Sequence, residues 1–379
     1  MDNLLKKIRD TFSSVFQSRG GDQSIVGIDI GTSSIKAVQV RVKNGRAILE
    51  TYGSIALGPY DSKESGAVTN LPTDKIVQAI TDVLRESGIT APNAAISITS
   101  TASLIFIVEL PASVTEKEFP TAVPIEARKQ IPVPISEVSL DWWAIPKRQE
   151  AFEDPVVQEE GEQRAEKQNT QVLIVSILND AIERYKIIGA GLGKNLSPFE
   201  SEVFSSVRAN SNRELGAVMV LDVGASKTKV TVVEYGVVKG FHIINRGSHD
   251  ISASIATALN ISFAKAEEIK KEFGLIGNAP DPSVSDIIRL SLDFIFSEAK
   301  TAMLEYERTN KKMVTKIILS GGGTLLKGFH EASKKHFSCE VVYGEPFAKT
   351  ESPAFLANIL KTIGPEFAIS VGVALRDLH

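Results

Sequence analysis

Apolar and polar residues follow short repeating patterns along the chain, and these patterns predict alternating strands and helices. Early in the chain two apolar runs flank a polar turn, and a third run, "AILETYGSIAL", follows the pair Asn44-Gly45. Asn-Gly between β-rich runs favours a tight two-residue hairpin. Residues 73–89 then repeat apolar positions every three or four residues, which predicts a helix with Thr73 or Asp74 as its cap. The chain therefore begins as a mixed α/β fold.

A block with a different pattern interrupts this arrangement. It contains strand-like runs around a proline-interrupted helical region, and residues 149–170 are acidic and polar without periodicity, which is typical of an exposed loop. At 379 residues the chain exceeds a usual single core, so two lobes are expected. The predicted division is an N-terminal extension and linker at 1–23, a first lobe at 24–103 and 179–214, a small inserted α+β subdomain at 104–178, and a second lobe at 215–379.

The N-terminal extension has an amphipathic pattern of its own over residues 1–18. Its basic residues Lys6, Lys7 and Arg9 lie away from one apolar helical face. That face consists of Leu4, Leu5, Ile8, Phe12, Val15 and Phe16. Such a helix lies on a membrane surface, or it docks on the protein body or on a partner, and the pattern favours neither strongly.

Composition narrows the class of protein. The formal net charge of −4 provides no broad basic surface, so nucleic acid is set aside as a partner. The single cysteine, Cys339, forms no internal disulfide and no zinc cluster, which indicates the reducing cytoplasm. No stretch is expected to reach the roughly 18 apolar residues that a membrane-spanning helix needs.

A polar turn occurs twice in the chain, and this repeat carries most of the chemistry. The first copy is "GIDIGTSSIKAVQV" at 27–40, and the second is "LDVGASKTKVTVVEYG", which begins at Leu221. Asp29, Gly31, Ser33 and Lys36 of the first copy match Asp222, Gly224, Ser226 and Lys229 of the second. Peptide N–H groups and hydroxyls in such turns form anion sites, and a carboxylate beside phosphates requires a cation between them. A single copy is equally well explained as a hairpin with a polar tip; two copies favour a pair of facing phosphate turns.

Two further segments accompany the repeated turns. "ILSGGGTLLKGF" places Gly321, Gly322 and Gly323 between a strand and a predicted helix, so the backbone can approach a ligand closely. "AKAEEIKKEFG" predicts a helix on which Glu267 and Lys270 share one face. Taken alone, this second segment is better explained as a solvated charged helix.

These four segments together resemble the nucleotide-binding fold of actin, Hsp70 and the sugar kinases. The resemblance implies an α/β, actin-like (ribonuclease H-like) two-lobed ATPase fold that binds ATP and Mg²⁺. It assigns Asp29 and Asp222 to hydrated Mg²⁺. It assigns Gly31, Thr32, Ser33, Ser34 and Lys36, with Gly224, Ala225, Ser226, Lys227 and Thr228, to the phosphates. It assigns Glu267, Lys270, Gly321, Gly322, Gly323, Thr324 and Leu325 to the adenosine.

Within this superfamily the chain resembles the PilM family of type IV pilus assembly proteins. The resemblance runs through "IEARKQIPVPISEVSLDWW", "VLIVSILNDAIERYKIIGAGL" and "FAISVGVALR" as well as the turns. PilM shares its inserted subdomain with the cell-division protein FtsA, but FtsA carries a C-terminal linker and amphipathic helix that are not expected here. The resemblance implies a cytoplasmic ATP-binding scaffold associated with the inner membrane through partners. Those partners are the N-terminal tail of PilN, in a groove beside the inserted subdomain, and possible further platform proteins and motor ATPases.

Hydrolysis is expected to be slow or negligible. The second turn, "GASKTK", is less glycine-rich than related turns, and a polar residue must orient the attacking water. Glu200 is the best positional match for that residue, Glu202 is second, and either is equally well a helix-terminal carboxylate. Two alternative functions stay open, an FtsA-like filament protein and a small-molecule kinase that would require a catalytic Asp such as Asp141. Trp142 and Trp143 face opposite sides of one predicted strand, so one of them is a candidate contact for the partner.

Overall fold

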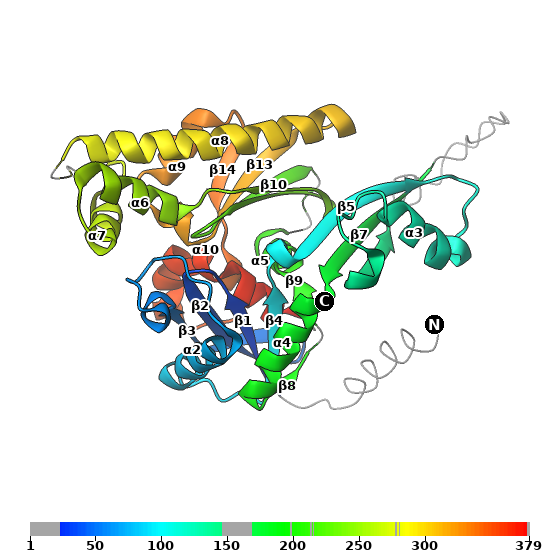
Figure 1. The fold of residues 1–379 in the computed structure, drawn as a ribbon, viewed down its shortest axis with the longest axis horizontal. Coiled ribbons are helices and arrows are strands. Elements are labelled where there is room, and N and C mark those ends of the chain that lie inside the picture. The colour runs from blue at the N-terminus through cyan, green and yellow to red at the C-terminus, as the bar shows by residue number, and fades with distance from the viewer. Residues whose placement is uncertain are drawn as a thin grey trace.

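The computed structural model describes residues 23–145 and 169–376, except for 198, 213, 215, 277, 278 and 280. The predicted amphipathic segment at 1–18 and most of the predicted polar loop at 149–170 lie outside the described residues. The rest forms two large sheets with helices and a smaller sheet at one end of the molecule (Figure 1).

The two large sheets have the same strand arrangement. The first has the order β3-β2-β1-β4-β8 with β9 on β4, and the second has the order β12-β11-β10-β13-β14. In each, a three-stranded antiparallel meander is extended by parallel strands. The first comprises β1 (Gln23–Ile30), β2 (Ser34–Lys43), β3 (Arg46–Ala56), β4 (Asn93–Ile98), β8 (Asn195–Leu196) and β9 (Glu200–Ser201). The second comprises β10 (Ala217–Val223), β11 (Thr228–Glu234), β12 (Val237–Ile244), β13 (Val314–Ser320) and β14 (Glu340–Tyr343).

The predicted hairpin at Asn44-Gly45 is confirmed. β2 ends at Lys43 and β3 begins at Arg46, which leaves these two residues as the loop. Both have positive φ values, 52° and 74°, as a tight turn that matches the twist of the strands requires. The register is therefore fixed at this end of the first sheet, with Lys43 opposite Arg46.

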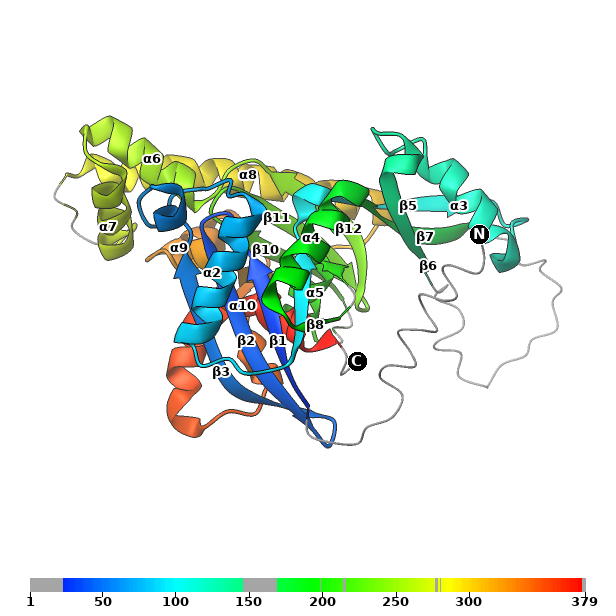
Figure 2. The ribbon, with the colours of Figure 1, turned by 60° about the horizontal axis from the view of Figure 1, so that its bottom comes forward.

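Helices cover both faces of the first sheet. α2 (Thr73–Glu86) buries Ile76, Ile80 and Val83 on one face, beside α4 (Asn179–Leu192). The predicted cap at Thr73 or Asp74 is wrong, because Pro72 is the N-cap and no described side chain caps this helix. α10 (Ala357–Ala374, red) covers the other face, against β1 and β2 (Figures 1 and 2).

Two helices cross where the lobes meet. α5 (Glu202–Asn210) follows the first sheet in the sequence but packs on the second sheet through Val203 and Val207. α10 follows the second sheet in the sequence but packs on the first. A Cβ built at Gly372 would lie 1.9 Å from the carbonyl oxygen of Ser205, so this crossing requires glycine. Each sheet is thus covered by a helix from the other half of the chain.

α10 also corrects an expectation about membrane-spanning length. Among the described residues, the helical stretch at 354–374 is long and apolar enough to cross a membrane by length and composition. In the fold, residues 367–374 are all buried between the first sheet and α5. The apolar character of this helix is explained by its place in the core.

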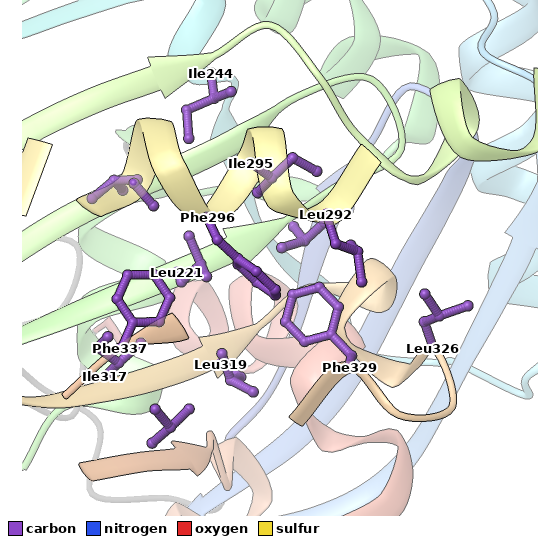
Figure 3. Packing of buried hydrophobic residues seen from close by; sticks show 14 of the residues in the cluster. Leu221, Ile244, Leu292, Ile295, Phe296, Ile317, Leu319, Leu326, Phe329 and Phe337 are labelled. Atoms are coloured by element: carbon purple, nitrogen blue, oxygen red, sulfur yellow. The ribbon is translucent and has the colours of Figure 1, made fainter. Parts of the chain in front are cut away.

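The core of the second lobe lies under one long helix. Phe296 from α8 (Ser283–Asn310) meets Phe329 and Phe337 edge to face, with ring centroids 5.2 and 5.8 Å apart, and this cluster packs on Leu221 and Leu319 of the sheet (Figure 3). The helices of this lobe are α6 (Ser248–Leu259), α7 (Phe263–Phe273), α8 (Ser283–Asn310) and α9 (Phe329–His336).

The third sheet extends from one end of the molecule. It has the antiparallel order β5-β7-β6, with β5 (Ser103–Leu110), β6 (Val138–Ala144), β7 (Thr170–Leu178) and α3 (Phe119–Ala127) (Figure 2). Trp142 packs into the small core under α3, whereas Trp143, on the opposite face, is 48% exposed. The division of the chain into lobes and subdomain at the residues given above stays a prediction.

Candidate functional site

The two repeated turns have the same backbone geometry. In the first, Asp29 on β1 lies directly opposite Lys36 on β2; in the second, Asp222 on β10 lies opposite Lys229 on β11. The glycine N–H of each turn donates to the carbonyl three residues on, at 3.1 Å from Gly31 and 2.9 Å in the second turn. The sequence repeat is therefore a structural repeat.

Both turns also require their glycine. A Cβ at Gly31 would lie 2.8 Å from the carbonyl oxygen of Ser34, and one at Gly224 would lie 2.9 Å from that of Lys227. Atoms at these distances overlap, so a larger residue would open the turn. The N–H of Ser248 at the start of α6 donates to the Gly224 carbonyl at 3.0 Å and anchors the second turn.

The turns face each other across one cavity. The Thr32 hydroxyl donates to the Ser226 hydroxyl at 3.2 Å, although the two residues lie 194 positions apart. The predicted site residues that line this cavity are Asp29, Gly31, Thr32, Ser33, Lys36, Asp222, Gly224, Ala225, Ser226, Lys227, Gly321 and Gly322. Ser34 and Thr228 lie just behind it, and Thr228 is fully buried and donates to the carbonyl of Arg246 at 2.9 Å.

Buried charges form the floor of this cavity. Lys229 Nζ lies 2.8 Å from Asp222 Oδ2 and 3.0 Å from Glu202 Oε2. The other oxygen of Glu202 accepts the N–H of Ser100 at 2.7 Å. Asp29 is 7% exposed and lies within the field of the same charges. Three carboxylates from both lobes therefore surround one ammonium group.

Burial and charge act in opposite directions on these groups. Burial raises the pKa of Asp29 to about 6, against the opposing charge of Lys36. Burial alone would raise the pKa of Glu202, but Lys229 and the Ser100 N–H lower it below its ordinary value. Burial alone would lower the pKa of Lys229, yet Asp222 and Glu202 raise it. Lys229 is thus held as a cation, and burial disfavours the charge of Asp29.

The lysine of the first turn has a different partner. Lys36 Nζ lies 3.8 Å from Glu366 on α10, just as Lys229 reaches Glu202 on α5. Each turn therefore sends its lysine to a glutamate of the helix that covers its own sheet. The Lys36 pair is looser, and Glu366 is 30% exposed.

The carboxylates fit a hydrated magnesium ion. Asp29 and Asp222 both line the cavity, on opposite lobes. Asp222 Oδ2 is buried, and apart from its ion pair with Lys229 Nζ at 2.8 Å it has no hydrogen-bond partner among the described residues. An oxygen in this state accepts a hydrogen bond from a metal-bound water, and Mg²⁺ in proteins usually keeps several waters.

The glycine-rich segment follows β13 as a tight turn. Gly321 has φ 82°, and a Cβ there would lie 2.4 Å from Asp222 Oδ1. Gly322, Gly323, Thr324 and Leu325 form a single 3-10 turn. The glycines lie between β13 and α9 as predicted, but α9 begins at residue 329, after this turn. The backbone nonetheless comes close to the second Asp-Gly turn.

Glu267 and Lys270 form a buried pair on α7. Lys270 Nζ lies 2.6 Å from Glu267 Oε2 and donates to the carbonyl of Ser248 at 2.9 Å. Glu267 is 8% exposed and Lys270 is 5% exposed, so the interpretation as a solvated charged face is wrong for this pair. Gly66 of the first lobe lies against Glu267, where an added Cβ would be 3.1 Å from its carboxyl carbon. Like Gly323, Thr324 and Leu325, the pair does not line the cavity between the turns in the described structure.

Glu200 and Glu202 lie at different sites. Glu200 forms a two-point ion pair with Arg208, with an N–O distance of 2.8 Å for one bond, and accepts the Ser205 hydroxyl at 2.6 Å. It lines a second groove, whereas Glu202 lines the cavity between the turns. The sequence favoured Glu200 over Glu202, and it matched Lys229 with Lys36 but predicted no role for Lys229 in the site. The matched spacing of Asp222 and Lys229 was the available signal, because residues seven apart around a four-residue turn lie opposite each other.

The second groove lies between the inserted sheet, α5 and the β11–β12 turn. Its volume is about 550 Å³. Trp143 and Phe204 meet there edge to face with ring centroids 5.7 Å apart. The groove is lined by Trp143, Ile145, Leu173, Val175, Ile177, Phe199, Phe204, Val237 and Val238, with Asp141, Glu200, Arg208 and Arg376 among them. It is therefore an apolar groove with fixed charges.

The duplicated sheets, the facing Asp-Gly turns and the crossed helices define an actin-like ATPase fold. Solved structures share it. EutJ from Carboxydothermus hydrogenoformans matches with a TM-score of 0.53 and 16% identity, covering 93% of this chain and 89% of that chain. MreB 5 of Spiroplasma citri bound to AMPPNP matches with a TM-score of 0.50 and 10% identity, covering 94% and 96%. The predicted α/β fold is confirmed.

The particular family follows from the sequence. The family model for type IV pilus assembly protein PilM matches residues 27–378, so the chain belongs to this family, as its resemblance indicated. A solved PilM-PilN type IV pilus biogenesis complex has the same fold, with a TM-score of 0.75, 24% identity, and coverage of 94% of this chain and 98% of that chain.

Cell division protein FtsA is a more distant relative. The protein from Helicobacter pylori is 24% identical over 195 residues, which cover 44% of this chain and 38% of the relative. The protein from Buchnera aphidicola is 23% identical over 184 residues, which cover 41% and 44%. The chain thus spans less than half the length of these relatives.

Proposed function

We propose that this chain binds ATP with hydrated Mg²⁺ in the cavity between the two Asp-Gly turns. The observation that carries this proposal is the contact of Thr32 with Ser226, which brings the two turns onto one cavity. Peptide N–H groups and hydroxyls of both turns hold the phosphates, and Asp29 and Asp222 hold the waters of the cation. Glu267, Lys270 and the segment Gly321–Leu325 hold the adenosine.

This cavity must widen to admit the nucleotide. Its volume is about 110 Å³, and small-molecule sites usually measure about 300–1,000 Å³. Of the residues proposed for the adenosine, Gly321 and Gly322 line the cavity, whereas Glu267 and Lys270 lie beyond it, where Gly66 of the first lobe lies against Glu267 of the second. Separation of the lobes opens both parts together, so ATP binding sets the angle between them.

A thermal-shift experiment tests the nucleotide site. Mg-ATP at about 100 times its dissociation constant stabilises a folded protein by roughly 2.7 kcal/mol. We expect a rise in melting temperature of about 3 °C for a chain of this length, and none for Asp222→Ala. The same concentration of Mg²⁺ without ATP is the control. An unchanged melting temperature of the wild type with Mg-ATP would remove the nucleotide proposal.

Hydrolysis is proposed to be slow or negligible. Besides the two turn aspartates, Glu202 is a carboxylate that lines this cavity, and both of its oxygens are already engaged, one by Lys229 and one by the Ser100 N–H. A carboxylate held in this way is a poor acceptor for the proton of an attacking water. Steady-state phosphate release measures this, and a turnover above about 1 s⁻¹, the low end for enzymes, contradicts it.

We propose further that the second groove holds the N-terminal tail of PilN. The support is the apolar groove beside the inserted sheet, together with the fold shared with a PilM-PilN complex. On this proposal the chain is a scaffold at the cytoplasmic face of the inner membrane, tied to it through the tail. Aromatic side chains that are half exposed at such grooves often dominate binding, which points to Trp143.

A pull-down and titration with a tail peptide test the groove. Trp143→Ala is expected to weaken binding by about 30-fold, the size typical of a dominant contact. Phe355→Ala is the matched control, because Phe355 is 79% exposed and lies outside both cavities. Equal affinity of the Trp143 variant and the wild type assigns the tail to another surface.

A further inference from the structure

Lys229 lines the cavity between the two Asp-Gly turns. It extends from β11 beneath the second turn, and its side chain is 13% exposed. Its ammonium lies among Asp222 of the second lobe, Glu202 of α5 and Asp29 of the first lobe, which are all largely buried. This is the region between the two lobes into which Asp29 and Asp222 project, where a divalent cation is expected.

The matching lysine shows that this position is not dictated by the turn itself. Lys36 has the same register opposite Asp29, yet its ammonium is 3.8 Å from Glu366. Its contact is looser than those of Lys229 at 2.8 and 3.0 Å. The two turns are alike in backbone, but Lys229 is held by two close carboxylate contacts, whereas Lys36 has one looser contact.

The position of the Lys229 ammonium affects how well the cavity can accept a polyanion. Four carboxylates line the cavity proposed for the triphosphate, those of Asp29, Glu202, Asp222 and Glu366, against three lysines, Lys36, Lys227 and Lys229. Without a cation among them, a polyanion is repelled, and repulsion is strong where water is excluded. A lysine ammonium is a compact charge with three donors, so it neutralises neighbouring carboxylates effectively.

We propose that Lys229 is a built-in cation of the cleft, which supplies part of the charge neutralisation that nucleotide binding otherwise takes from Mg²⁺. This inference rests on the proposed nucleotide site. It adds that Lys229 sets how strongly ATP affinity depends on Mg²⁺. The wild-type protein therefore binds ATP in the presence of EDTA with only a moderate loss of affinity. The Lys229→Met protein binds ATP well only when Mg²⁺ is present.

Titration calorimetry with ATP in Mg²⁺ and in EDTA tests the proposal. We expect the dissociation constant of the wild type to differ by less than about tenfold between the two buffers. For Lys229→Met we expect affinity in EDTA to fall a further ten- to hundredfold, the value of about one charge-assisted hydrogen bond. In Mg²⁺ its affinity stays within about threefold of the wild type, because the added cation replaces the lost one.

Matched variants separate this role from a structural one. Lys229→Arg keeps the charge and is expected to behave as the wild type in EDTA. Lys36→Met removes a lysine from the other turn and is expected to weaken binding by the same factor in both buffers. If Lys229→Met unfolds, the double variant Glu202→Gln, Lys229→Met removes the charge pair and is titrated in its place.

Two outcomes overturn the proposal. Equal losses for Lys229→Met in Mg²⁺ and in EDTA, or no loss in either, show that Lys229 is a structural ion-pair partner only. Absence of ATP binding by the wild type in both buffers is different, since it removes the nucleotide site itself. The two failures are therefore distinguishable in one set of titrations.

Discussion

Replacement of Asp29 by asparagine is expected to stabilise the nucleotide-free protein. Burial raises the pKa of this carboxyl from its ordinary 3.8 to about 6, so the folded state binds its proton more tightly than the unfolded chain. At pH 7 the group is ionised in both states, and the charge is disfavoured only in the folded one. The wild type therefore loses stability as the pH rises from about 4 to about 6, and the loss persists above that range.

The magnitude follows from the pKa difference of about two, which corresponds to about 3 kcal/mol at ~1.4 kcal/mol per pKa unit. Unfolding a chain of 379 residues carries an entropy near 0.8 kcal/mol per degree, so the melting temperature rises by about 3–4 °C. At pH 4 the advantage of Asp29→Asn shrinks to well below 1 kcal/mol, since the carboxyl is protonated in the folded wild type.

Circular dichroism melts in EDTA, without nucleotide, at pH 4, 5.5 and 7.5 measure this dependence. Asp222→Asn is the matched control at the equivalent position of the second turn. It is expected to lower the melting temperature at pH 7.5, because Lys229 loses the charge that lies 2.8 Å away. The reasoning about Asp29 is refuted if Asp29→Asn melts at or below the wild-type temperature at pH 7.5, or if its advantage is the same at every pH.

Three further substitutions test the packing and the site. Glu200→Ala is expected to cost about 3 kcal/mol, because it leaves the partly buried Arg208 with the Gly372 carbonyl but without its carboxylate, while ATP affinity stays unchanged; urea unfolding and titration measure the two, and full stability or a loss of ATP affinity contradicts it. Gly372→Ala is expected to cost about 1–3 kcal/mol in urea unfolding, since the new Cβ meets the carbonyl of Ser205; a neutral result shows that the helices can separate there. Gly321→Ala is expected to weaken ATP binding by at least about tenfold, a loss of ~1.4 kcal/mol, because the added methyl displaces Asp222 or strains the turn at φ 82°; unchanged affinity in titration contradicts this.

Backbone features of the site were predictable from the sequence because they depend on local chemistry. The spacing of Asp, Gly and Lys in the two turns predicted paired hairpins, since residues equally far from a tight turn lie opposite each other. The pair Asn44-Gly45 predicted the next hairpin, because few other residues accept positive φ twice in succession.

Side-chain partners were not predictable in the same way. Glu200 and Glu202 are separated by one residue, and the sequence favoured Glu200. In the structure Glu200 pairs with Arg208, and Glu202 lies in the cavity. That choice depends on where α5 begins and on which lobe each side chain meets, and both are long-range properties. Lys229 also contacts this helix through Glu202. The sequence therefore indicated that Lys229 lies opposite Asp222, but it did not indicate the contact with Glu202.

The exchange of covering helices between the sheets also has a consequence for how the protein is made. The first sheet contains the earliest strands, β1 to β4, yet one of its faces is closed by α10, which begins only at Ala357. During synthesis from the N-terminus, apolar residues such as Val38 and Val40 therefore stay exposed until almost the whole chain has been made. A ribosome that pauses late in the message leaves this face open, so the nascent first lobe needs a chaperone for longer than its position in the sequence suggests.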